Sequence, residues 1–131
     1  MPFSGWIAVG GGAAVGAWLR WWLGLVLNPV FPTIPLGTLA SNLIAGLIMG
    51  FAMELMMRYT ALSPELRLLV TTGFLGGLST FSTFSAEIVT LLSHKEYLWA
   101  FGAIAAHVIG SVALTIAGIF IVRFVLSTEA A

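Results

Sequence analysis

Apolar residues occupy most of the chain in four long stretches, which short polar segments separate. Because a membrane-spanning helix needs about 20 mostly apolar residues, each stretch is long enough to be one. The predicted spans are residues 6–27, 36–57, 66–92 and 97–126. Three prolines stop helices within Asn28–Pro35, and residues 93–96 form a polar loop. Ser63 is a predicted N-cap, with Pro64 at the first helical position after it.

The third span contains an unusual segment, Gly73–Ser85. It has three glycines within five residues, and then hydroxyl residues interrupted only by two phenylalanines. Each glycine weakens a helix by about 1 kcal/mol relative to alanine, so we expect the helix to break near Gly76 and Gly77, within residues 75–79. Broken backbone at membrane depth is tolerated where it lines a cavity or holds an ion. That is our working hypothesis for this segment.

Composition agrees with a membrane protein of one domain. The chain has 131 residues, of which 60% are hydrophobic and 8% charged, whereas an ordinary soluble domain has roughly 25% charged residues. The absence of cysteine excludes disulfides and thiolate chemistry. Zero net charge without a basic run argues against nucleic acid as a partner. We see no signal peptide and no catalytic constellation, and we expect no enzyme.

Positive charges give little orientation preference. Arg58, Arg67 and Arg123 fall on one side of the predicted bundle, while Lys95 and Arg20 fall toward the other. Under the positive-inside rule this bias is small, so the chain could insert both ways round and pair as an antiparallel dimer. A fixed topology set by the loop charges is the other interpretation, and charge alone leaves both open.

Polar residues inside the first two spans need a reason, because they are costly in a membrane. Arg20, beside three tryptophans, either snorkels to the interface or provides a cation at the mouth of an anion path. Asn42 offers two N–H donors and one acceptor, and composition alone favours a helix–helix hydrogen bond. Glu54, near the end of its span, can reach lipid headgroups, and we assign it no role. Glycines at GxxxG spacing, which indicates close helix packing, are Gly12 and Gly16, Gly46 and Gly50, and Gly73 and Gly77.

Beyond the expected break, the residues of the third span can be assigned to separate faces of a helix. Phe81, Phe84 and Ile88 share one face by helical spacing, which is typical of core packing. Aromatic ring edges carry positive potential, however, so two such edges beside hydroxyl and amide donors would also suit a small anion. Glu87 is either a proton-carrying site or a hydrogen-bonding partner for a polar track. The sequence does not decide between these two roles.

In the fourth span, a polar stripe is formed by three residues spaced one helical turn apart: His107, Ser111 and Thr115. A metal site based on histidine is not expected, because the other histidine, His94, lies in a loop.

Together these features resemble the Fluc (CrcB) family of fluoride channels. The resemblance rests on four short spans, an asparagine near the start of the second, and the thirteen residues Gly73–Ser85. It also includes the segments Gly16–Arg20 and Gly37–Leu39, and it covers nearly the whole chain.

The resemblance implies an all-α membrane protein with four transmembrane helices, a broken third helix, and an antiparallel dual-topology homodimer with two fluoride pores. By similarity, a structural sodium ion would be held by the backbone carbonyls of Gly76 and Ser79. The fluoride-pore residues that it implies are Arg20, Asn42, Phe81, Ser82, Thr83, Phe84, Glu87, His107 and Ser111. His107 is a departure, since some relatives carry a hydroxyl there, and it suggests pH sensitivity.

The function implied is a passive, highly selective fluoride channel of the inner (plasma) membrane, which exports fluoride and lowers its toxicity. The alternative is a proton-coupled four-span exporter, either a fluoride/proton antiporter or one of the small multidrug type. A small multidrug exporter needs a carboxylate in its first span, and residues 6–27 contain none. A purely structural subunit would leave the hydroxyl-rich segment unexplained.

Overall fold

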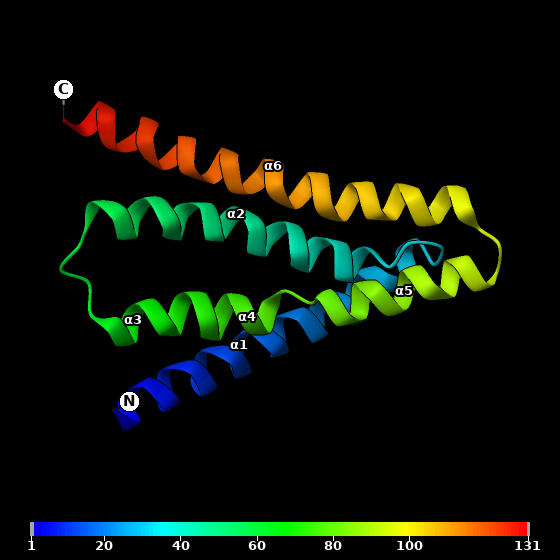
Figure 1. Cartoon of the computed structure of the whole chain (residues 1–131), viewed down its shortest axis with the longest axis horizontal. Helices are drawn as coiled ribbons and strands as arrows, with labels where there is room; N and C mark the ends of the chain where they lie inside the picture. The colour runs from blue at the N-terminus through cyan, green and yellow to red at the C-terminus, as the bar shows by residue number, and fades with distance from the viewer. Residues whose placement is uncertain (1, 131) are drawn as a thin grey trace.

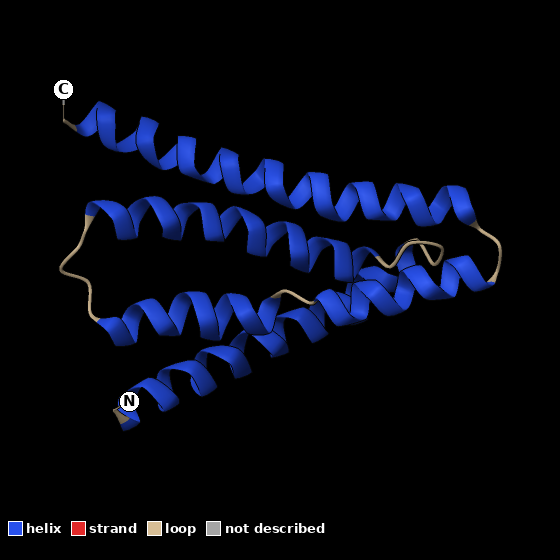
Figure 2. Cartoon of the chain, viewed as in Figure 1, coloured by secondary structure: helices blue, strands red, loops and turns tan. Residues whose placement is uncertain are grey.

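The computed structural model describes residues 2–130, and its regular structure in that range is entirely helical (Figure 2). The chain runs back and forth between two ends of an elongated molecule, with α2 beside α6 and α1 crossing the third helical segment (Figure 1). The elements are α1 (Phe3–Leu27), η1 (Asn28–Val30), α2 (Leu36–Arg58), α3 (Pro64–Leu68), η2 (Leu69–Leu75), α4 (Gly76–Leu78), α5 (Phe81–Ser93) and α6 (Tyr97–Glu129).

Three helical segments are long and apolar enough to cross a membrane: Leu36–Arg58, Pro64–Ser93 and Tyr97–Glu129. The first predicted span corresponds to α1, which has 25 residues and is therefore about 37 Å long, enough for a hydrocarbon core of about 30 Å. It is not among the three, because Arg20, its glycines and its tryptophans lower its mean hydropathy. A fourth span therefore stays a prediction.

The turn after α2 is closed by polar groups from the next helix. Ser63 Oγ accepts a hydrogen bond from Leu66 N–H at 3.2 Å, and Pro64 is the first residue of α3, which confirms the predicted helix start. The Arg67 side chain donates to the carbonyl oxygens of Met56, Tyr59, Thr60 and Leu62 at 3.3 to 3.4 Å. Arginine thus satisfies carbonyls that the end of a helix leaves unpaired.

Glycines bring α1 into backbone contact with the third helical segment. A methyl group added to Gly16 would collide with the backbone of Phe74, and one added to Gly77 would collide with the backbone of Ala13. Gly50 of α2 and Gly118 of α6 approach each other in the same way. Close packing, the role predicted from the GxxxG spacing, is confirmed for these contacts.

The helix break lies later than the glycines predict. Gly76–Leu78 remains helical, and the backbone becomes extended at Ser79 (φ −79°, ψ 155°) and Thr80 (φ −150°, ψ 111°). The break therefore begins within the predicted residues 75–79, at Ser79, but two residues after Gly77, for a physical reason. Gly77 lets α1 approach closely, and the chain stays helical through η2 and α4 up to Leu78.

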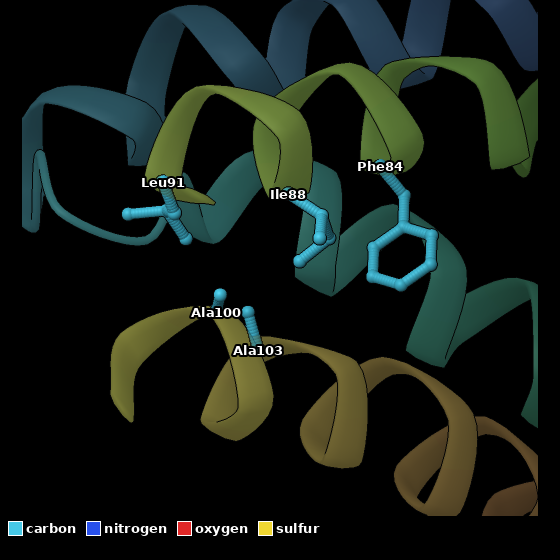
Figure 3. Packing of buried hydrophobic residues seen from close by; sticks show 5 residues of the cluster. All are labelled: Phe84, Ile88, Leu91, Ala100 and Ala103. Atoms are coloured by element: carbon cyan, nitrogen blue, oxygen red, sulfur yellow. The ribbon is translucent and has the colours of Figure 1, made fainter. Parts of the chain in front are cut away.

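One cluster of buried apolar side chains joins α5 to α6. Phe84, Ile88 and Leu91 of α5 face Ala100 and Ala103 of α6, where small side chains make room for large ones (Figure 3). Large apolar side chains elsewhere on α6 remain exposed, as lipid or a partner chain would require: Leu98, Phe101, Ile109, Val112, Phe120 and Phe124.

Candidate functional site

The helix break opens onto a pocket of about 440 Å³ between α2, η2, α4, α5 and α6. The pocket is open on one side, and several residue types that the sequence singled out meet in its lining. Those residues are Asn42, Gly76, Ser79, Phe81, Phe84, His107 and Ser111.

Asn42 pairs with the broken backbone through both ends of its side-chain amide. Its Oδ1 accepts a hydrogen bond from Thr80 N–H at 2.7 Å, and its Nδ2 donates to the Thr80 carbonyl oxygen at 3.2 Å. One side chain of α2 therefore satisfies both backbone groups of a residue that has left the helix. The helix–helix hydrogen bond expected for Asn42 is also present, because Nδ2 lies 3.0 Å from His107 Nδ1 on α6.

Thr80 begins α5 as its N-cap. Its Oγ1 accepts from Thr83 N–H at 3.1 Å and donates to Thr83 Oγ1 at 3.0 Å, while Ser82 Oγ lies 3.4 Å away. Ser82 and Thr83 are thereby placed at the exposed start of α5. Sequence reasoning did not include Thr80 among the site residues. Its N-cap spacing, three residues before Thr83, is the signal that identifies it.

Carbonyl groups in the last turn before the break have lost their helical donors. An unbroken helix would bond Thr80 N–H to the Gly76 carbonyl and Thr83 N–H to the Ser79 carbonyl. Both N–H groups bond side chains instead. Within residues 2–130, no cluster of three or more acidic or histidine side chains is placed to hold a metal. Backbone oxygens at Gly76 and Ser79 are therefore the candidate ligands for a hard cation.

Arg20 extends from α1 to the same turn. Its Nε donates to the Gly77 carbonyl oxygen at 3.0 Å, and the residue is partly buried. Of the two interpretations of Arg20, snorkelling to the membrane interface does not describe this contact. The guanidinium brings a positive charge to the broken turn.

His107 contributes a hydrogen-bond donor, as the neighbouring contacts require. Because Thr80 N–H can only donate, the Asn42 atom facing it is Oδ1, and the other amide atom is Nδ2. Nδ2 can only donate, so His107 Nδ1, 3.0 Å away, accepts. The ring proton then lies on Nε2, which is buried and has no hydrogen-bond partner among the described residues. His107 is 4% exposed.

Two phenylalanines and His107 form one aromatic cluster. The rings of Phe81 and Phe84 meet edge to face, with centroids 5.6 Å apart, and Phe84 lies 4.5 Å from the His107 ring. Phe84 is 7% exposed and packs with Ile88, whereas Phe81 is 78% exposed. Phe81 and Phe84 are in contact, as their helical spacing predicts. Core packing holds for Phe84 and Ile88 but not for Phe81, because α5 begins at Phe81 and only its later turns pack on α6.

Glu87 lies apart from this cluster, in a second pocket of about 380 Å³ that His94 and Glu96 also line. Thr38 Oγ1 donates to Glu87 Oε2 at 2.6 Å. The structure thus places Glu87 as the acceptor of a hydroxyl, which agrees with the polar-track role that the sequence left open.

The polar stripe of α6 faces α2. Ser111 Oγ donates to the Asn42 carbonyl oxygen at 3.4 Å, and Thr115 Oγ1 donates to the Gly46 carbonyl oxygen at 2.9 Å. These hydroxyls hold the two helices together along the pocket wall.

Glu54 has a role that the sequence analysis did not assign. Its two carboxylate oxygens each accept a hydrogen bond at 3.0 Å, one from Arg58 Nε and the other from Arg123 Nε, and its side chain is 7% exposed. Glu54 therefore ties α2 to α6 rather than extending to headgroups. The i, i+4 spacing to Arg58 was the available signal.

The chain is similar to a known protein family and to several of its members. The chain matches the family model described as "CrcB-like protein, Camphor Resistance (CrcB)" over residues 7–119. It is 57% identical over 117 residues to the "Fluoride-specific ion channel FluC" of Nitrosospira multiformis, covering 89% of this chain and 91% of that protein. The protein of the same name from Nitrosomonas europaea is 58% identical over 113 residues, with 86% and 89% covered. The one from Pseudomonas putida is 55% identical over 119 residues, with 91% and 94% covered.

Proposed function

The chain belongs to the CrcB family, and we propose that it is a passive, highly selective fluoride channel that exports fluoride from the cytoplasm and lowers its toxicity. It is a multi-pass membrane protein, for which we propose the inner (plasma) membrane as location. Its relatives carry the name of a channel and not of an enzyme, which agrees with the expectation that the chain is not an enzyme.

The observation that carries this proposal is the orphaned Nε2–H of His107, buried beside Phe84 in the pocket at the break. Fluoride is small and strongly hydrated, so it leaves water only where donors replace its hydration shell. Phe81 and Phe84 line the same pocket, and aromatic ring edges would supply further, weaker donors. A larger halide would form weaker hydrogen bonds with the same donors and would have less room in the pocket.

The channel would be an antiparallel homodimer with two pores. The pocket that holds the donors is open in a single chain, and Phe81 beside it is 78% exposed. A second copy would close the pocket and cover that ring, and the small charge bias allows the two copies to insert in opposite orientations.

A structural sodium ion would lie at the seam between the two copies. Gly76 and Ser79 are exposed in the single chain, and their carbonyls have lost their helical donors to side chains. Hard cations prefer such oxygen ligands. When bound, the ion would supply a fixed positive charge close to the anion path.

The competing function is a proton-coupled four-span exporter. The hydrogen bond of Glu87 to Thr38 gives this carboxylate a defined partner outside the pocket at the break. In the channel, Glu87 accepts hydroxyl donors along the polar track and carries no proton across the membrane.

Purified protein in liposomes distinguishes these functions. With a fluoride electrode, a potassium gradient and valinomycin, the channel releases fluoride rapidly without any proton gradient, and a chloride electrode records almost no efflux. Comparable chloride efflux would rule out selectivity. Fluoride flux that requires a pH gradient and ignores voltage would favour the exporter.

A further inference from the structure

The backbone break is held open by two side chains, each of which takes one N–H group from the helix. Asn42 Oδ1 accepts Thr80 N–H at 2.7 Å, and Thr80 Oγ1 accepts Thr83 N–H at 3.1 Å. In a continuous helix those two N–H groups would bond Gly76 and Ser79. The two carbonyls whose helical donors these side chains take are thus the same two that the proposed function assigns to sodium.

Three neighbouring carbonyls do have partners. Leu75 O accepts from Ser79 N–H at 3.0 Å and from Ser79 Oγ at 2.8 Å. Gly77 O accepts from Arg20 Nε at 3.0 Å, and Thr80 O accepts from Asn42 Nδ2 at 3.2 Å. Hydrogen bonds around the break therefore satisfy these three carbonyls and leave those of Gly76 and Ser79 free. The Leu78 carbonyl also loses its helical donor, Ser82 N–H, but Leu78 is buried whereas Gly76 and Ser79 are exposed.

We propose that Asn42 and Thr80 are the positioning residues of the cation site, which they create by diverting two backbone N–H groups from the carbonyls of Gly76 and Ser79. This inference rests on the sodium site of the proposed function and adds the reason why those carbonyls are free. Without the Asn42 acceptor, Thr80 N–H turns back to Gly76, and a cation must then compete with that hydrogen bond.

Asn42 also links the cation site to the anion donor. Its Nδ2, besides bonding Thr80 O, donates to His107 Nδ1 at 3.0 Å and so leaves the ring proton on Nε2. One amide therefore fixes both the carbonyl ligand for a cation and the N–H donor for an anion. The two sites are joined through a single side chain of α2.

Sodium-dependent thermal stability of the purified dimer tests this inference. Melting is recorded against NaCl concentration, with N-methylglucamine chloride keeping the ionic strength constant. Asn42→Leu keeps the side-chain shape without the acceptor, and Thr80→Val removes the N-cap hydroxyl at constant volume. In each variant, we expect the sodium concentration for half-maximal stabilisation to rise at least about fivefold, since one hydrogen bond must first be broken.

Two matched variants separate positioning from general damage. Asn42→Asp retains an oxygen acceptor for Thr80 N–H, so its sodium dependence stays close to that of the original protein or strengthens. Thr115→Val lies in the same pocket wall, but its hydroxyl bonds Gly46 and Ser111 and not the break, so it changes nothing in the sodium response. A variant that is merely less stable melts earlier in both salts with an unchanged sodium shift.

Each outcome decides a separate point. A sodium shift in the original protein that persists unchanged in Asn42→Leu and Thr80→Val overturns the inference and leaves the sodium site standing. If one variant does not form a dimer, the other still tests the mechanism through its own carbonyl. If sodium does not change the melting temperature of the original protein, both the sodium site and this inference are overturned. The liposome flux measurement then still tests the channel function independently.

Discussion

His107 carries a hydrogen-bond donor, Nε2–H, that no described residue uses. Its tautomer follows from Asn42, whose Nδ2 donates to Nδ1. We predict that ¹⁵N spectra of histidine-labelled protein show a neutral ring protonated at Nε2 and bare at Nδ1. His94→Gln identifies the signal, because the sequence has two histidines. A proton found on Nδ1 would contradict the hydrogen-bond assignment around Asn42.

Phe81 and Phe84 differ in burial, so their substitutions separate function from stability. Both Phe81→Ile and Phe84→Ile should sharply reduce fluoride flux in liposomes while the dimer persists, since each removes a ring from the pocket. Only Phe84→Ile should also lower the free energy of unfolding, by about 1 kcal/mol, because it loses packing against Ile88 and the His107 ring. Unchanged fluoride flux in either variant would show that the substituted ring does not line the pore.

At the scale of elements, glycines decide how closely α1 approaches the third helical segment. Gly16→Ala should lower the free energy of unfolding by about 1–3 kcal/mol, because the new methyl group meets the backbone of Phe74. Gly11→Ala is the matched control on the same helix, where nothing lies within 4 Å. It should be neutral or stabilising by up to about 1 kcal/mol. Equal melting temperatures for both variants would refute close packing at Gly16.

The helices and their glycine contacts could be predicted because they depend on local patterns. Apolar periodicity marked the spans, Ser63 marked a helix start, and GxxxG spacing marked the contacts of Gly16 and Gly77. The break was predicted within residues 75–79 and begins at Ser79, but its extension to Thr80 could not be predicted in this way. It depends on Asn42, which is far from Thr80 in the sequence and supplies the hydrogen bonds that an extended Thr80 needs.

The sequence predicts which residues belong to the candidate site better than it predicts which of them contact one another. The sequence singled out Asn42 and His107, but not that they bond each other, because their partnership spans α2 and α6. Glu54 shows the same limit, since Arg123 reaches it from a distant helix. Helical spacing correctly placed Phe81 beside Phe84 and Phe84 beside Ile88. It could not show that Phe81 is exposed, because a helix that starts at Phe81 has no earlier turn to bury it.

For the whole molecule, the distribution of exposed surface separates two environments. Large apolar side chains such as Leu98 and Phe124 are exposed on α6. Only 6% of the most apolar stretch of α6 is buried inside the molecule, as expected for a lipid-facing helix. The pocket at the break is different, because Asn42, Ser111 and the Gly76 backbone bring polar groups to an open face. Lipid tails cannot hydrogen-bond such groups, which supports the proposal that a second copy of the chain covers this face.

Orientation of the two copies can be measured with single cysteines, since the chain has none of its own. Ser93→Cys ends α5 and Ser127→Cys lies near the end of α6, and these helix ends are at opposite ends of the molecule (Figure 1). With dual topology, an impermeant thiol reagent added outside sealed proteoliposomes labels about half of each variant, because the charge bias is small. The remainder reacts after permeabilisation. A fixed topology within uniformly inserted vesicles would instead label one variant fully and the other not at all, and an antiparallel dimer could not form from such chains.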